Sequence, residues 1–133
     1  RNTKDIQRPF TVGINDDVTR LSLSMPGHSL VTLPEDKVTQ CVFWGFGSDG
    51  TVGANKEAIK MIGNYHEKMS VQAYFEYDSK KSSGWTISHL RFSPTIDIQA
   101  PFNVEEGQAH YVACHNESYV QAHKFDVVKY LKR

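Results

Sequence analysis

An apolar strand that leads through a glycine-rich turn into a helix is the feature that most constrains this chain. Residues 38–46 are mainly apolar or β-branched, and four glycines fall within the nine residues 45–53. Apolar residues then recur at helical spacing as far as Lys68. A helix that starts at such a turn points free backbone N–H groups at an anion, and glycine lets the backbone approach that anion closely. The segment therefore predicts a binding site for a phosphate-bearing molecule.

Length and composition limit the functions that the chain can have. Its 133 residues fit one domain, and 15 basic residues balance 15 acidic ones. A zero net charge gives no basic field to attract nucleic acid or an anionic membrane. No apolar run is long enough to span a bilayer, and no signal peptide is visible. The chain starts without Met and stops within a helical pattern, so we expect a segment of a longer protein.

Alternating strand and helix patterns predict an α/β domain with three layers, α/β/α, around a mixed, mostly parallel sheet. The apolar run 38–46 is typical of a central strand that is covered on both faces. Strands 71–77 and 85–92 have no helix between them, so this pair is expected to be antiparallel. Residues 1–37 are interpreted as a lead-in arm and residues 38–133 as the domain. Further strands are expected at 10–14, 18–23, 96–98 and 110–115, and helices at about 52–68 and 117–132.

The turn matches the dinucleotide-binding pattern G-x-G-x-x-G over Gly45–Gly50, between the strand and the helix that this pattern requires. A dinucleotide site also needs an acid about 20 residues further on, at the end of the next strand. The candidates Glu76 and Asp78 lie 26 and 28 residues after Gly50, which is late. A Rossmann-type dinucleotide site is therefore kept only as an alternative.

Two other phosphate motifs are incomplete. Lys56 is not part of the G-K-[ST] ending that a Walker A loop requires. Asp49-Gly50 could begin a thiamine diphosphate signature, but the chain has no Asn-Asn pair to complete it. The remaining alternative is a purely structural turn, in which Asp49 or Thr51 caps the helix.

A second candidate for anion binding is the loop 78–84, in which Lys80 and Lys81 stand among hydroxyl residues. The loop follows the strand 71–77. In a parallel sheet the end of that strand lies on the same rim as the glycine turn, so the two loops would support each other. The alternative is a loop that is simply solvated.

The cysteines and histidines do not form a recognisable metal or nucleophile motif. Cys41 and Cys114 lie far apart, and two cysteines are too few for a zinc or iron–sulfur site. We interpret them as buried free thiols in a reducing compartment. His110 and Cys114 would share one face of a strand while His115 points away. No metal ligand and no catalytic residue is therefore expected in this chain.

Several blocks of the sequence resemble, in order, the gamma-type domain (domain III) of pyruvate:ferredoxin (flavodoxin) oxidoreductase. The main block is residues 43–56, FWGFGSDGTVGANK. Further blocks are residues 58–63, 77–84, 88–92 and 112–115, and residues 10–19 resemble the lead-in from the preceding domain. The family domain continues well past the position of Arg133, so the resemblance implies a domain that is incomplete at its C-terminal end.

The resemblance implies a cytoplasmic, homodimeric enzyme that oxidatively decarboxylates pyruvate, or a related 2-oxo acid, to an acyl-coenzyme A. Ferredoxin or flavodoxin would accept the electrons. Thiamine diphosphate and iron–sulfur clusters would be bound by other parts of that enzyme. This segment would help to bind coenzyme A and would carry out no bond-making step. The alternative is a non-catalytic docking module, which the large aromatic residues near loops favour.

The expected coenzyme A contacts are backbone N–H groups of the glycine turn, joined by the side chains of Asn55 and Lys56. The members of the turn are Gly47, Ser48, Asp49, Gly50, Thr51 and Val52. Lys80 and Lys81 are secondary candidates. Asp49 is interpreted as a turn or cap residue rather than as an acid or base.

Overall fold

The computed structural model describes residues 9–24, 33–80, 84–121 and 125–132. The chain divides into two compact units, residues 1–30 and 31–133. In the first unit β1 (Thr11–Val12) and β2 (Ser22–Leu23) form a parallel pair, so the two strands expected here are present but shorter. Asp17 organises the turn between them, because its carboxylate accepts hydrogen bonds from the N–H groups of Thr19 and Leu21 at 3.0 and 2.8 Å.

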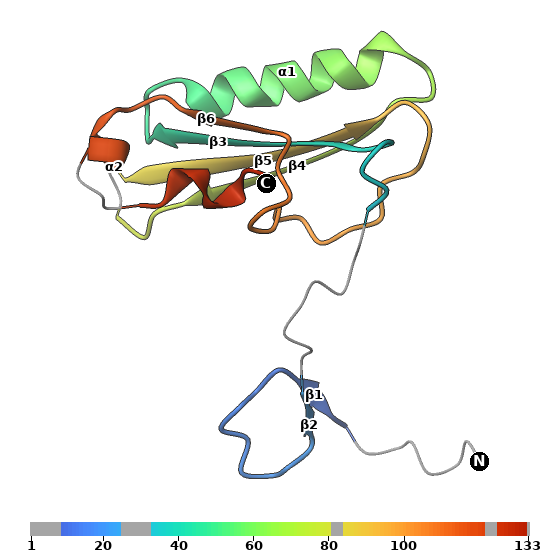
Figure 1. Ribbon diagram of the computed structural model, residues 1–133, viewed down its shortest axis with the longest axis vertical. Helices are drawn as coiled ribbons and strands as arrows, with labels where there is room; N and C mark the ends of the chain where they lie inside the picture. Colours follow the sequence, from blue (N-terminus) through green and yellow to red (C-terminus); the bar gives the residue numbers. More distant parts are fainter. Residues whose placement is uncertain (1–8, 25–32, 81–83, 122–124, 133) are drawn as a thin grey trace. The chain divides into compact units, whose positions relative to one another are not determined.

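The second unit contains a mixed sheet with the strand order β4-β5-β3-β6 (Figure 1). Its strands are β3 (Thr39–Phe46), β4 (Ser70–Tyr77), β5 (Trp85–Ser93) and β6 (Tyr111–Cys114). β5 pairs antiparallel with both β3 and β4, whereas β3 pairs parallel with β6. The predicted α/β class, the mixed sheet and the antiparallel β4–β5 pair are confirmed. Among the described strands of this sheet antiparallel pairs outnumber parallel ones, which corrects the expected proportion, because β5 returns from β4 by a short loop and inserts beside β3.

Three helices accompany this sheet in the described part of the unit. They are α1 (Thr51–Tyr65), α2 (Ser118–Gln121) and the 3-10 helix η2 (Val127–Tyr130). α1 ends before the expected Lys68 because the backbone of His66 is extended. The expectation of one helix over 117–132 is wrong. The N–H of Ala109 donates to Tyr130 O at 2.7 Å and the N–H of Lys132 donates to Ala109 O at 2.8 Å, so the end of the chain bonds to a distant segment instead of to itself.

The segment 94–109 is irregular where it is described, so the edge strand expected at 96–98 is also wrong. Side-chain oxygens take the place of a strand partner, since the N–H of Ile98 donates to Ser70 Oγ at 3.0 Å. Two buried residues of β5 hold the rest of the segment. His89 Nδ1 accepts a hydrogen bond from Val104 N–H at 3.0 Å. Arg91 donates to the carbonyl oxygens of Pro101, Phe102 and Asn103.

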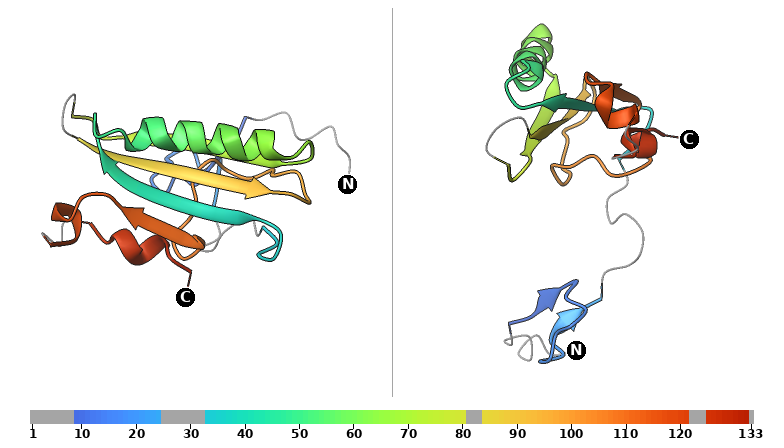
Figure 2. Two further views of the ribbon diagram at one scale, coloured as in Figure 1. Left: turned by 90° about the horizontal axis from the view of Figure 1, so that it is seen from above. Right: turned by 90° about the vertical axis from the view of Figure 1, so that its left-hand side faces the viewer.

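Two apolar cores lie on opposite faces of the sheet. Beneath α1, Ile59 packs with Cys41 and Leu90. The core on the other face contains Val42, Trp44, Ile87, Val104, Ala109, Tyr119 and Val127. Figure 2 shows α1 on one side of the sheet and α2 and η2 on the other. The alternation along each strand thus sends its side chains into two separate cores and gives the expected three layers.

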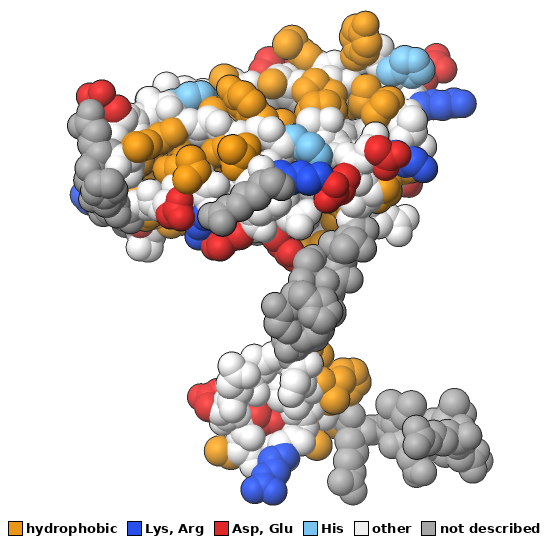
Figure 3. Space-filling model, in the orientation of Figure 1, with side chains coloured by type: hydrophobic (Ala, Val, Ile, Leu, Met, Phe, Trp, Pro, Cys, Tyr) orange, Lys and Arg blue, Asp and Glu red, His pale blue; other side chains and the backbone are white. Residues whose placement is uncertain are grey.

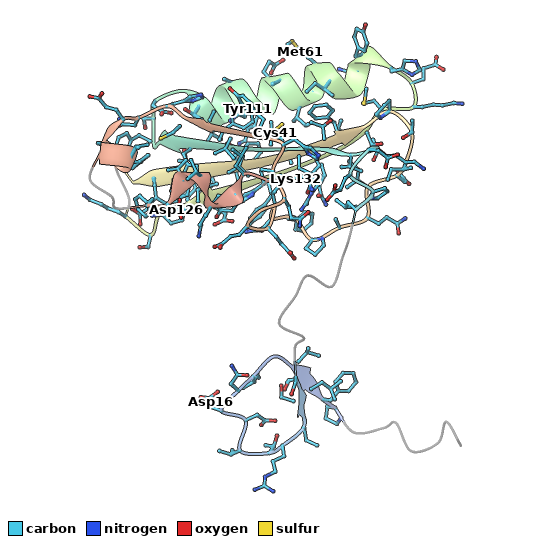
Figure 4. All side chains as sticks on the ribbon, viewed as in Figure 1. Asp16, Cys41, Met61, Tyr111, Asp126 and Lys132 are labelled. Atoms are coloured by element: carbon cyan, nitrogen blue, oxygen red, sulfur yellow. The ribbon has the colours of Figure 1, made fainter. Side chains whose placement is uncertain are left out.

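Several large hydrophobic side chains of this unit remain exposed, among them Met61, Tyr65, Tyr111, Val120 and Val128. Figure 3 shows hydrophobic side chains gathered on the face that carries α1, β6 and η2. Met61 stands on the outer side of α1, away from the sheet (Figure 4). No helix in the described part of the chain combines the length and the apolar character needed to cross a membrane.

Candidate functional site

The carboxyl ends of three strands meet at one edge of the sheet, here called the rim. Phe46 at the end of β3 pairs with Trp85 at the start of β5, and Tyr77 at the end of β4 pairs with Thr86. β6 ends beside them, because Cys114 pairs with β3 two residues before Phe46. The glycine turn and the loop after β4 therefore leave the sheet at the same rim, as expected. β4 runs in the same direction as β3 because β5 lies between them and is antiparallel to both, and not because β4 and β3 are parallel neighbours.

The glycine turn is held together by Asp49. Its carboxylate accepts hydrogen bonds from the N–H groups of Phe46 and Thr51, both at 2.8 Å. Partial burial raises the pKa of Asp49, but these hydrogen bonds outweigh it and hold the pKa below its ordinary value of 3.8. Asp49 is therefore an ionised turn residue at neutral pH. The N-cap of α1 is Gly50, with φ 89°, because the left-handed conformation at this position suits glycine. It is neither Asp49 nor Thr51, the caps named in the alternative of a purely structural turn.

The second-last residue of β3, Gly45, is glycine because the start of α1 packs directly against it. A Cβ atom on Gly45 would lie 2.5 Å from Thr51 Oγ1 and 2.9 Å from Asp49 Oδ2. The carbonyl oxygen of Gly45 also accepts a hydrogen bond from the buried hydroxyl of Tyr119 at 3.1 Å. The first glycine of the apparent dinucleotide pattern thus serves the internal packing of this turn.

Three of the six expected backbone donors are engaged with other residues in the described part of the chain. The N–H of Gly47 donates to Gly84 O at 2.8 Å, and the N–H of Asp49 donates to Phe46 O at 3.2 Å. The N–H of Thr51 is taken by Asp49. The other members of the expected set are Ser48, Gly50 and Val52. Their N–H groups, together with the positive end of the α1 dipole, are what this turn can offer to a phosphate.

The expected side-chain contacts occupy different places. Asn55 is only 6% exposed and belongs to the buried stripe of α1. Lys56 Nζ lies 5.3 Å from the centroid of the Phe75 ring, a cation–π distance. Lys80 is exposed in the loop after β4, whereas Lys81 lies outside the described residues. The structure therefore brings Lys80 and the glycine turn to the rim, whereas the side chain of Asn55 lies on the buried, sheet-facing side of α1.

His115 is a rim residue that the sequence did not identify as part of the site. It follows β6, and its Nδ1 lies 2.9 Å from Thr51 Oγ1, 64 residues away in the chain. Thr51 is also hydrogen-bonded to Asp49, and His115 helps to lower the pKa of that carboxyl. Two sequence signals point to His115: its position at the end of an expected strand, where parallel strands present ligand-binding residues, and its place in the block 112–115 that resembles the family domain.

Among the described residues, no three His, Cys, Asp or Glu residues are grouped in a way that could hold a metal ion. Burial raises the pKa of Cys41 to about 11, so its thiol is protonated and a poor nucleophile at neutral pH.

Comparison with known proteins identifies the family. The model of the family described as pyruvate ferredoxin/flavodoxin oxidoreductase matches residues 40–133, which include α1 and the whole rim. The chain belongs to this family. The resemblance of its sequence blocks is thereby confirmed, and it extends over the irregular segment 94–109 as well.

Three similar proteins show how much of a family member this chain represents. It is 55% identical to a pyruvate:ferredoxin oxidoreductase of Moorella thermoacetica, over 84% of the chain and 9% of that protein. It is 48% identical to a pyruvate-flavodoxin oxidoreductase of Klebsiella pneumoniae, over 92% of the chain and 10% of that protein. It is 52% identical to a mitochondrial pyruvate dehydrogenase (NADP+) of Euglena gracilis, over 92% of the chain and 6% of that protein. The chain thus spans a tenth or less of the length of these relatives.

Proposed function

We propose that this chain is part of a multidomain oxidoreductase that converts pyruvate to acetyl-coenzyme A, and that its rim helps to bind coenzyme A. The observation that carries the first part is the family match over residues 40–133. The three relatives named above share pyruvate in their names but differ in the acceptor, which is ferredoxin, flavodoxin or NADP+. A segment that is about equally similar to all three serves a part of the reaction that does not depend on the acceptor.

The rim supports coenzyme A as the ligand, because coenzyme A carries phosphate groups. The N–H groups of Ser48, Gly50 and Val52 would donate to one phosphate, and Lys80 would add a positive charge. Asp49 stays ionised next to them and repels a phosphate that comes too close to its carboxylate. We therefore place the phosphate on the N-terminal side of α1 toward the loop after β4, rather than over Asp49.

Within the larger enzyme this chain would bind and orient coenzyme A. The decarboxylation and electron-transfer steps depend on thiamine diphosphate and iron–sulfur clusters, which we place on other parts of the enzyme. The two cysteines of this chain are too few for a cluster. Ferredoxin or flavodoxin would meet the enzyme elsewhere, and we expect the whole enzyme to be a cytoplasmic homodimer.

The test uses steady-state kinetics of a full-length enzyme that contains this segment. We expect Lys80→Ala or Gly50→Ala to raise the KM for coenzyme A by roughly tenfold and to leave the KM for pyruvate unchanged, because a hydrogen bond to a charged group is lost or misplaced. Lys60→Ala is the matched control, since Lys60 is exposed on α1 and pairs with Glu57 at 3.5 Å. The assignment is wrong if the KM for pyruvate changes and the KM for coenzyme A does not.

The second candidate is a module that only docks other parts of the enzyme. The exposed hydrophobic residues over α1, β6 and η2 favour it, because a patch of this kind usually marks an interface. Met61→Ser would then weaken the association of domains, seen as earlier proteolysis of the full-length enzyme, without any change in the KM for coenzyme A. The two candidates occupy different surfaces and are compatible.

A further inference from the structure

Four buried side-chain polar atoms have no hydrogen-bond partner among the described residues. One is Trp44 Nε1, in the core on the face of the sheet away from α1. The other three are Asn55 Nδ2 on α1 and the hydroxyl oxygens Thr86 Oγ1 and Ser88 Oγ on β5, residues with exposed fractions of 6%, 2% and 0%. Unpartnered polar atoms are rare in protein interiors because their desolvation is not compensated. Three of them between one helix and one strand call for a physical explanation.

The packing of α1 shows where Asn55 lies. Its buried residues are Thr51, Asn55 and Ile59, which are four residues apart and form one stripe toward the sheet. Thr51 contacts the end of β3 at Gly45, while Ile59 packs against Leu90. Asn55 stands one turn from each of them. It therefore lies over the sheet halfway between the level of Gly45 and the level of Leu90.

The register of β5 places the two hydroxyls at the same spot. Thr86 on β5 pairs with Gly45 on the neighbouring strand β3, and Leu90 lies four residues further along β5. Thr86, Ser88 and Leu90 alternate along the strand and share one face, the face that α1 covers. Ser88 is thus at the level of Asn55, and Thr86 is one step nearer the rim. We call these three side chains together the polar seam.

The three groups have complementary chemistry but do not bond to each other directly. The amide of Asn55 is a donor, and each hydroxyl can both donate and accept. A single water can make two to four hydrogen bonds of both kinds. We propose that the polar seam binds an ordered internal water that bridges Asn55 to Thr86 or Ser88 and so ties the first half of α1 to β5. Asn55 then acts as a positioning residue for the N-terminal turn of α1, and not as the direct ligand contact expected from the sequence.

This inference does not rest on coenzyme A binding, since it concerns how α1 is fixed to the sheet. The first test is a crystal structure of the full-length enzyme at a resolution that shows ordered waters. We expect a density peak within hydrogen-bond distance, about 3.2 Å or less, of Asn55 and of at least one of the two hydroxyls. Direct hydrogen bonds among the three side chains, with no such peak, would overturn the proposal.

The second test is hydrogen exchange of residues 51–59 in the full-length enzyme after Thr86→Val combined with Ser88→Ala, which removes both hydroxyls with little change in shape. If water satisfies either hydroxyl, the variant loses a bond, and these amides should exchange roughly two- to tenfold faster. If neither hydroxyl has a partner, their removal is favourable and exchange stays the same or slows, which contradicts the proposal. Thr39→Val on β3 is the control, because Thr39 is half-buried at the opposite end of the sheet. It should leave the exchange of residues 51–59 unchanged.

Discussion

Replacing Gly45 by alanine tests whether the glycine turn is shaped by its own packing. The added Cβ would lie 2.5 Å from Thr51 Oγ1 and 2.6 Å from Thr51 Cβ. Ordinary contacts between such atoms are about 3.5–4.0 Å, so the start of α1 must move by roughly 1 Å. Thr51 is buried and bonded to both Asp49 and His115, which makes that movement costly. Overpacking of this kind lowers the free energy of unfolding by about 1–3 kcal/mol, and we expect the upper half of that range.

Gly53→Ala supplies the matched comparison. Gly53 lies within α1, and a Cβ there meets nothing within 4 Å. Alanine is favoured over glycine inside a helix by about 0.8–1.0 kcal/mol, so this variant should be more stable than the original chain. Urea unfolding of this chain, followed by the fluorescence of Trp44 and Trp85, measures the free energy of unfolding of both variants. If the two variants were equally stable, the close contact between β3 and α1 would not determine the residue at position 45.

Two further predictions concern charge. Asp49→Asn should lower the free energy of unfolding at neutral pH but not in acid. The pKa of Asp49 is lowered in the folded chain, so the stability that its carboxylate contributes is fully present above the ordinary pKa of 3.8. That stability is lost as the pH falls through the lower pKa of the folded state. Urea unfolding from pH 7 to pH 3 should show the two proteins converge, and a constant difference would contradict this assignment. Arg91→Lys should cost about 3 kcal/mol or more, because one ammonium cannot replace the hydrogen bonds at 2.7 Å to Gln40 and Gln72 together with those to residues 101–103. Protease cleavage within 94–109 should become faster in this variant, and an unchanged rate would show that the loop is held in another way.

The parts of the fold that the sequence predicted are those determined by neighbouring residues. The run 39–46, the turn and α1 each carry a local signal of apolar periodicity and glycine. The helix expected over 117–132 failed because its apolar spacing also fits a segment whose aromatic rings pack one by one against Trp44. These rings are Tyr119, Phe125 and Tyr130. Long-range backbone bonds to Ala109 then decide the outcome, and they have no signature in the sequence.

The candidate site was predicted in the same partial way. The meeting of the glycine turn and the loop after β4 follows from strand ends, and it held although β5 runs antiparallel. The contacts of His115 and Tyr119 to the turn join residues 64 and 74 positions apart, which periodicity and spacing cannot reveal. The interior position of Asn55 was also hidden, because a polar residue on the buried stripe of a helix looks like a surface residue in the sequence.

The central claim is that coenzyme A binds at the rim, and hydrogen exchange of a full-length enzyme tests it most directly. Saturating coenzyme A, added without pyruvate, should slow the exchange of residues 45–56 and of the loop 78–84. Residues 60–69, at the far end of α1, should not change. Protection elsewhere in the enzyme with no change at residues 45–56 would contradict the claim and would leave docking as the function of this segment.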